Sequence, residues 1–256
     1  MSVHHFLAFL LGGLTLFPSP VFAQMCGENN NDEMLPQTPK TGRTEGSRQQ
    51  LITRGEENCP SPTQPLTALT SPQASDYTFS AYPSFWFFIP FNQHEIKQLE
   101  FILYDKSERK MIYTTKITAP SQAGLIEVKI PQEAEYVLKE SETYRWYFFL
   151  DCKNSPSQQP DLEVNGWITR HPLTATVSEK IHSKQLLTTY LTYQNHGAWY
   201  DAVTYLADTL RADPENIHAQ VVWENLLACL NLNWVAQAQF VEEGINPKPK
   251  HQAQFE

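Results

Sequence analysis

The stretch Thr143–Cys152 reads TYRWYFFLDC, and it decides how the middle of the chain folds. Side chains of a β-strand point to alternate faces, so every second residue lies on the same side. On one side the residues are apolar or aromatic and end in a cysteine: Tyr144, Trp146, Phe148, Leu150 and Cys152. The other side begins with Arg145 and ends with Asp151. This pattern predicts a half-buried strand that carries Cys152 toward the core.

Further runs between residues 77 and 171 have the length and composition of strands. These runs are Tyr77–Ala81, Ser84–Phe91, Leu99–Asp105, Met111–Thr118, Gly124–Ile130 and Val164–His171. The charged residues 105–110 are typical of a hairpin turn between two of them. Leu138 and Tyr144 have the spacing of a tyrosine corner, in which the tyrosine hydroxyl bonds back to the backbone. We therefore predict an α+β protein, with an immunoglobulin-like antiparallel β-sandwich over residues 59–175 followed by helices.

The ends of the chain differ in composition from this domain. Residues 1–23 combine a short apolar run with Val21-Phe22-Ala23, which predicts a signal peptide cleaved after Ala23. Residues 24–58 are polar and are expected to form a disordered linker, as is the tail 246–256. Residues 59–69 are rich in proline and are expected to lie across the domain as an extended strap. Export to the periplasm or cell envelope follows from the signal peptide.

The four cysteines all follow the predicted cleavage site. In an exported protein, paired cysteines are usually structural, and four of them allow three full pairings. We favour a disulfide between Cys59 and Cys152, because both flank segments with strong structural signals while Cys26 lies in the polar linker. Cys229 lies among leucines, where a buried thiol acts as a small apolar side chain. The spacing does not suit a zinc site, and we expect no metal or other cofactor.

Residues 176–245 have helical periodicity and resemble tetratricopeptide repeats. Tyr193, Gly197, Trp199 and Ala202 fall at the positions of one repeat, and Ala236 and Phe240 match a weaker second repeat. Two such units bury too little shared surface to stand alone, so these helices must pack on the sandwich or on a partner. Residues 177–245 carry three basic and eight acidic side chains, a net charge of −5.

No motif in the sequence indicates a reaction. His94-Glu95-Ile96-Lys97-Gln98 lacks the second histidine of a metalloprotease motif, and the Ser-x-x-Lys spacing at Ser107–Lys110 falls in a charged turn. The formal net charge of −9 argues against nucleic acid as a partner. A hydrolase with a site assembled from distant residues stays as an alternative.

Aromatic residues occupy both faces of the run Ser84–Phe91. We interpret this run as a strand covered on both sides, and we treat Trp167 in the same way. The alternative is that Trp86 or Trp167 stacks on sugars of an envelope polysaccharide, as in a carbohydrate-binding module.

Several stretches together resemble the domain-of-unknown-function family 928, a family of exported cyanobacterial proteins. They are Cys59-Pro60, residues 65–69, Pro83–Phe91, residues 99–101, Tyr144–Cys152, residues 166–168, residues 197–202 and residues 223–227. The resemblance implies a location in the cell envelope and brings no catalytic residues.

The absence of a catalytic motif beside an acidic, repeat-like helical surface favours a non-enzymatic protein. We expect it to bind another envelope protein, such as a sensor or secretion component. The expected contact residues are those of the helix from Lys184 to Gln194, with Trp199 and Tyr200.

Overall fold

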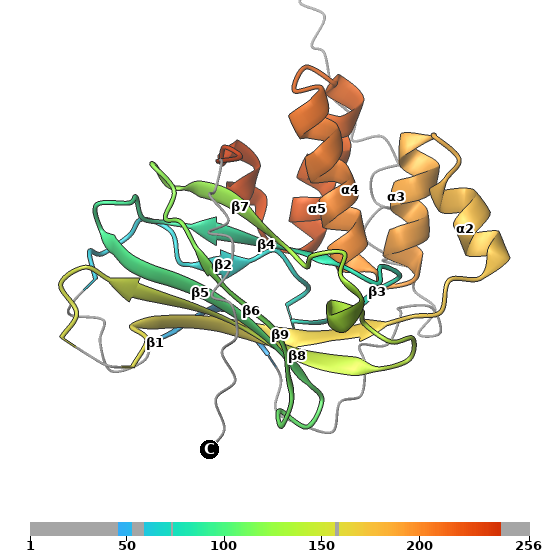
Figure 1. Ribbon diagram of the computed structural model, residues 1–256. Coiled ribbons are helices and arrows are strands. Elements are labelled where there is room, and N and C mark those ends of the chain that lie inside the picture. Colours follow the sequence, from blue (N-terminus) through green and yellow to red (C-terminus); the bar gives the residue numbers. More distant parts are fainter. Residues whose placement is uncertain (1–45, 53–58, 73, 157–158, 242–256) are drawn as a thin grey trace, which may run out of the picture.

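The computed structural model describes residues 46–52, 59–72, 74–156 and 159–241. These residues form a mixed α/β structure with a curled, mainly antiparallel sheet and four α-helices that stand together on one side of it (Figure 1). The predicted signal peptide and the tail 246–256 lie outside the described residues.

The strands are β1 Ser47–Ile52, β2 Thr67–Ala68, β3 Ser75–Thr78, β4 Ser84–Ile89, β5 Ile96–Asp105, β6 Met111–Ile117, β7 Gly124–Lys129, β8 Thr143–Cys152 and β9 Leu162–Arg170. The helices are α2 Ala175–Ile181, α3 Leu186–Asn195, α4 Trp199–Ala212 and α5 Ile217–Cys229, with short 3-10 helices η2 Ala134–Tyr136 and η3 Asn233–Gln237. All seven strands expected between residues 77 and 171 are present, and each end lies within three residues of its expected place.

The sheet follows the order β6-β5-β8-β9-β1-β2-β4-β7, with β3 paired in parallel to β9. Strand β1 therefore joins two halves that would otherwise be separate. This strand corrects the expectation of a disordered linker at residues 47–52. The prediction failed because this stretch has no alternation of apolar and polar residues. Strand pairing uses backbone groups, however, and β9 and β2 supply a pairing strand on each side of β1.

The main core lies where the two halves of the curled sheet face each other. The ring of Phe87 on β4 stacks on Phe148 of β8 at 4.1 Å between centroids, and Phe85 lies 4.7 Å from Phe101 of β5. The apolar side of β8 predicted from its alternation is buried in this core, from Tyr144 to Cys152. The Tyr144 hydroxyl accepts a hydrogen bond from the backbone N–H of Lys139 at 2.8 Å, as expected of a tyrosine corner.

The disulfide bond joins Cys59 to Cys152, the pair favoured from the sequence, with 5.4 Å between the Cα atoms. It fixes the start of the proline-rich strap to the end of β8. Cys229 is also disulfide-bonded, which corrects its interpretation as a buried free thiol. Leucine neighbours do not distinguish a thiol from a half-cystine, since both pack well among apolar side chains.

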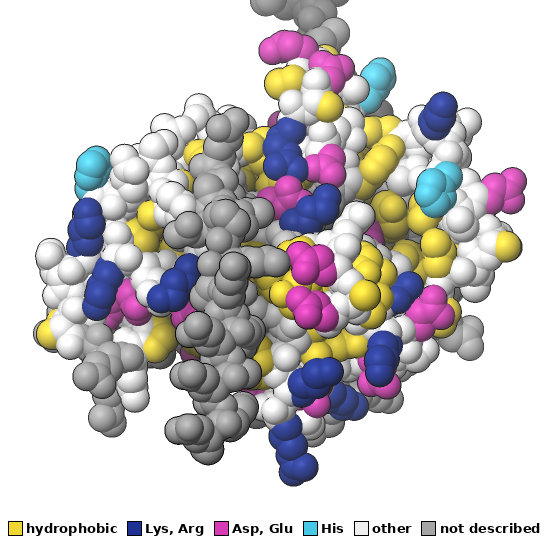
Figure 2. Space-filling view, in the orientation of Figure 1, with side chains coloured by type: hydrophobic (Ala, Val, Ile, Leu, Met, Phe, Trp, Pro, Cys, Tyr) yellow, Lys and Arg dark blue, Asp and Glu magenta, His cyan; other side chains and the backbone are white. Residues whose placement is uncertain are grey.

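The helices cover the outer face of β4 and do not form a free array. Trp86 of β4 and Leu125 of β7 share a second core with α4 and α5, including Leu206 and Trp223. Helix α5 begins at the cap Asn216, whose Oδ1 accepts a hydrogen bond from the N–H of Ala219 at 3.0 Å. The expectation that the helices pack on the sheet is therefore met. On the face seen in Figure 2, basic and acidic side chains lie close together over the helices, with hydrophobic side chains between them.

Candidate functional site

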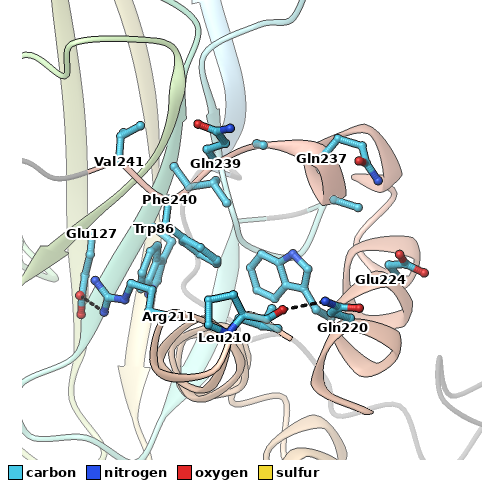
Figure 3. Close-up of a pocket in the computed structure, with 15 residues that line it drawn as sticks. Trp86, Glu127, Leu210, Arg211, Gln220, Glu224, Gln237, Gln239, Phe240 and Val241 are labelled. Atoms are coloured by element: carbon cyan, nitrogen blue, oxygen red, sulfur yellow. Dashed lines mark hydrogen bonds and ion pairs between the residues drawn. The ribbon is translucent and has the colours of Figure 1, made fainter. Parts of the chain in front are cut away.

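A pocket of about 1040 Å³ lies where the outer face of β4 and β7 meets the helices (Figure 3). Trp86, Leu125 and Glu127 come from the sheet, while the walls come from the end of α4, from α5, and from residues 236–241 after α5. Helix α4 packs over β4 and β3, so it leaves this corner beside β7 open. The pocket therefore collects residues that are far apart in the sequence.

Three aromatic side chains line the inner part of the pocket. Phe240 lies edge-on to Trp86, with ring centroids 5.6 Å apart, and it is tilted against Trp223 at 5.8 Å. The indole N–H of Trp86 donates to Thr204 Oγ1 of α4 at 3.2 Å, which fixes the ring to the helix. Trp86 and Trp223 are only 3% and 4% exposed, whereas Phe240 is half-buried, so Phe240 is the ring most open to a ligand.

Arg211 is the cationic side chain of the pocket. Its guanidinium lies over the Trp86 ring at 4.8 Å from the centroid, and its Nη2 bonds Glu127 Oε2 at 2.7 Å and also Asp208. Partial burial opposes the charge, but the carboxylates of Asp208 and Glu127 outweigh burial and raise the pKa of Arg211. These two carboxylates hold the Arg211 side chain in place and balance its positive charge within the protein. Glu224 on α5 also lines the pocket and is exposed.

One side of the pocket is the outer edge of β7, the last strand in the sheet order. Leu125 pairs in parallel with Phe240: the N–H of Leu125 donates to the Gln239 carbonyl at 2.7 Å, and the N–H of Val241 donates to the Leu125 carbonyl at 2.9 Å. Gly124 allows this close approach, because a Cβ there would lie 2.6 Å from the Gln239 carbonyl oxygen. Residues 239–241 thus already act as a short strand added to this edge.

The lining residues that the structure describes can contact a ligand through several kinds of side chain. They offer carboxylates, amides, one guanidinium and apolar side chains, and include no serine, threonine, cysteine, histidine, tyrosine or lysine. Glu127 is committed to Arg211. Of the groups that act as nucleophiles in enzymes, the described lining thus offers carboxylates, of which that of Glu224 is exposed.

The carboxyl groups with the most altered acidity lie elsewhere. Burial raises the pKa of Asp76 to about 6, although Arg48 and the backbone N–H of Ser71, 2.9 Å away, favour its ionised form. Burial also raises the pKa of Asp201 to about 6, and this carboxylate accepts the N–H of Phe79 at 3.0 Å. Each ties a loop to its neighbours, and neither lines the pocket.

Cys59, Cys152 and Asp161 bring possible metal-binding atoms within 4.8 Å of one another. The two sulfur atoms are bonded to each other, however, and Asp161 accepts hydrogen bonds from the Cys152 N–H at 2.8 Å and the Ser155 hydroxyl at 2.7 Å. We therefore interpret these three residues as a disulfide bond and a carboxylate that supports it, and not as a metal site.

The two tryptophans considered for sugar stacking are buried. Trp86 does line the pocket, but Arg211 lies over its ring. Trp167 is 1% exposed and lies beneath the guanidinium of Arg145, 4.7 Å from its ring centroid. The structure therefore contradicts a sugar-stacking role for Trp167. Trp86 forms part of the pocket wall, but its ring has no free face on which a sugar could stack.

The expected contact residues, Lys184 just before α3 and the others on α3 and α4, fall into two groups. Lys184 is exposed and Trp199 is partly buried. Gln194 and Tyr200 are 7% and 2% exposed, and the Tyr200 hydroxyl accepts from Trp146 Nε1 at 2.6 Å and donates to the Trp167 carbonyl at 3.1 Å. The prediction that these two residues contact a partner is wrong, because both are buried in the protein. Helical spacing shows which residues share a face of a helix, but it does not show which face the sheet covers.

Arg211, Glu127 and Glu224 were missed by reasoning from the sequence. Phe240 and Ala236 were noticed only as positions of a weak repeat. The one available signal was Gly124 at the start of a strand, because such a glycine often marks a close backbone approach.

Within the described residues, no helix combines the length and apolarity needed to cross a membrane. No curated protein matches this chain. Among solved structures, the chain is similar to that of astrotactin-2, described as "a conserved vertebrate-specific and perforin-like membrane protein involved in neuronal development". The similarity has a TM-score of 0.27 and 7% identity, and it covers 67% of this chain but only 37% of that one. The model of the family Domain of Unknown Function (DUF928) matches residues 44–240, and the chain belongs to this family.

Proposed function

We propose that this protein is a non-enzymatic binding protein of the cell envelope, which holds part of a partner protein in the pocket between β7 and the helices. The partner would be another envelope protein, such as a sensor or secretion component. Export rests on the predicted signal peptide of residues 1–23, and a cyanobacterial origin rests on the sequence resemblance.

The observation that carries this proposal is the lining of the pocket. It is large and open at a sheet edge, and it has an aromatic inner wall. Its polar groups are amides, carboxylates and one guanidinium, with no hydroxyl, thiol, imidazole or amine among the described lining residues. Pockets at the junction of structural layers, apolar inside with a few polar groups, are the usual binding sites of proteins.

For the fold, we propose that the curled sheet is a variant of an immunoglobulin-like sandwich and that α3 to α5 derive from a tetratricopeptide-like pair. The facing halves of the sheet and the hydrogen bond from Lys139 to Tyr144 support the first proposal. The Asn216 cap between α4 and α5 supports the second.

Photo-crosslinking in the native envelope tests the function. A photoreactive residue replaces Gln237 at the pocket rim or, as a matched control, Lys106 in the exposed β5–β6 turn. We expect one discrete protein crosslinked from position 237 and not from position 106. Equal labelling from both positions, or labelling of glycan without protein, would contradict the proposal.

Carbohydrate binding is the second candidate, favoured by the amides of Gln220, Gln237 and Gln239 around the half-buried ring of Phe240. Sugars are commonly held by such a combination of planar amides and an aromatic ring. Binding of envelope polysaccharide that is lost in Phe240→Ala would support this candidate.

A further inference from the structure

We propose that the partner segment in this pocket is an extended, basic stretch of polypeptide that adds to the outer edge of β7. This inference rests on the proposed function and names the chemistry of what the pocket binds. It has two independent supports, the backbone of β7 and the charges around it.

The backbone of β7 has outward pairing positions beside the pocket that no other described residue occupies. In an antiparallel pair, alternate residues direct their N–H and C=O groups away from the partner strand. Leu125 does so, because its groups bond residues 239 and 241. Glu127 and Lys129 have the same phase in β7, so their backbone groups also point away from β4. Within the described residues, none bonds these outward groups.

Glu127 connects this edge to the pocket, because it is both a lining residue and the next outward position after Leu125. An added strand that continues the pairing begun by residues 239–241 would therefore run along the pocket. Its side chains would alternate, one set entering the pocket beside Phe240 and the other facing solvent.

The charges select the kind of segment. The carboxylates of Glu127 and Asp208 hold the guanidinium of Arg211, and Glu224 lines the pocket on α5, so these four groups carry a net charge of −2. Lys129, exposed two residues further along β7, brings the charge along this edge to −1. Arg211 is occupied by Glu127 and Asp208, so it is a poor receptor for a partner's carboxylate. Lysine or arginine side chains on the added strand would meet uncompensated negative charge, and acidic side chains would be repelled.

Peptide binding to the purified full chain, measured by fluorescence anisotropy, tests the inference. The probes are a labelled ten-residue peptide alternating lysine with valine and threonine, the same peptide with glutamate for lysine, and the lysine peptide with alternate backbone N–H groups methylated. We expect the lysine peptide to bind at least about tenfold more tightly than either of the other two, since one loses the charge match and the other the backbone pairing.

A charge reversal in the protein locates the site. Glu224→Lys should weaken binding of the lysine peptide by about fivefold, whereas Glu179→Lys, on the exposed face of α2, should leave it unchanged. Equal affinity for lysine and glutamate peptides, or full affinity of the methylated peptide, would overturn the inference. So would binding that appears only when residues 242–256 are deleted, because the edge would then belong to this chain's own C-terminal segment.

The two proposals can fail separately. If position 237 crosslinks a protein partner but the peptides show no preference, the binding function stands and the basic strand is wrong. If position 237 crosslinks nothing and no peptide binds, both are wrong.

Discussion

Gly124 is the residue that lets the C-terminal part of the fold close onto the sheet. A side chain there would meet the Gln239 carbonyl at 2.6 Å and Val241 Cγ1 at 2.7 Å. Gly124→Ala should therefore destabilise the protein by about 1–3 kcal/mol, the usual cost of overpacking, in urea denaturation. Ser121→Ala, at an exposed position nearby, is the control and should change stability by less than about 0.5 kcal/mol. An unchanged midpoint in Gly124→Ala would mean that residues 239–241 do not depend on this contact.

Asp76 should make stability depend on pH in an unusual direction for a carboxylate. Its side chain is 2% exposed, and burial raises its pKa to about 6, so the folded protein holds the proton more tightly than the unfolded chain does. Between pH 4 and 6 the unfolded chain loses this proton first. The contribution of Asp76 is thus most favourable below about pH 4 and is lost as the pH rises through 6.

Comparison with Asp76→Asn isolates this effect from that of Asp201 and other groups. The difference in unfolding free energy, wild type minus variant, should fall by about 2 kcal/mol between pH 4 and pH 7. Asp213→Asn, at an exposed carboxylate, provides the reference, and its difference should stay flat. A flat difference for Asp76→Asn as well would show that this carboxyl group is not buried in a low-dielectric site.

At the scale of elements, Tyr200 joins α4 to the sheet. Its hydroxyl lies between Trp146 Nε1 of β8 and the Trp167 carbonyl of β9. Tyr200→Phe leaves a buried indole N–H without its acceptor, which should cost about 1–3 kcal/mol of stability in thermal or urea denaturation. Tyr205→Phe, on the same helix but partly exposed, should cost much less. Equal losses in the two variants would contradict a specific role for the Tyr200 hydroxyl.

The strands with regular alternation were predictable, and those without it were not. Strand β8 has the same bounds in sequence and structure, because its apolar side is continuous from Tyr144 to Cys152. Strand β1 was missed because its stability comes from pairing on both sides and not from its own polar side chains. Two-residue β2 is too short for any periodic signal. Helices α4 and α5 were expected as helices, but the face that packs on β4 depends on the sheet, which the local sequence does not describe.

For the whole molecule, the disulfide between Cys59 and Cys152 closes a loop with a separation of 93 residues. In the chain-entropy model a loop of this length contributes about 4–5 kcal/mol. Replacing both cysteines by serine should therefore lower the free energy of unfolding by several kcal/mol, measured by urea denaturation without reductant. A loss below about 1 kcal/mol would show that the unfolded chain is not restrained by this bond.

The candidate site is a property of the whole molecule, which explains why sequence reasoning did not find it. Trp86, Glu127, Arg211, Glu224 and Phe240 come together only after the sheet has curled and the helices have packed on it. No two of them share a motif or a helical face. Phe240 was noticed beforehand only as a repeat position. Trp86 was expected on a strand covered on both sides, as the structure has it, and the alternative of a sugar platform gives way to a wall of the pocket.

The most direct test of the binding site is amide hydrogen exchange of the full chain with and without the partner recovered from position 237. Exchange reports the protection of individual backbone N–H groups. The outward N–H groups of Glu127 and Lys129 in β7 should become protected on binding, while those of β6 at the other end of the sheet should not change. Protection confined to β6 or to α2 and α3, with β7 unaffected, would contradict the assignment of the binding site to this pocket.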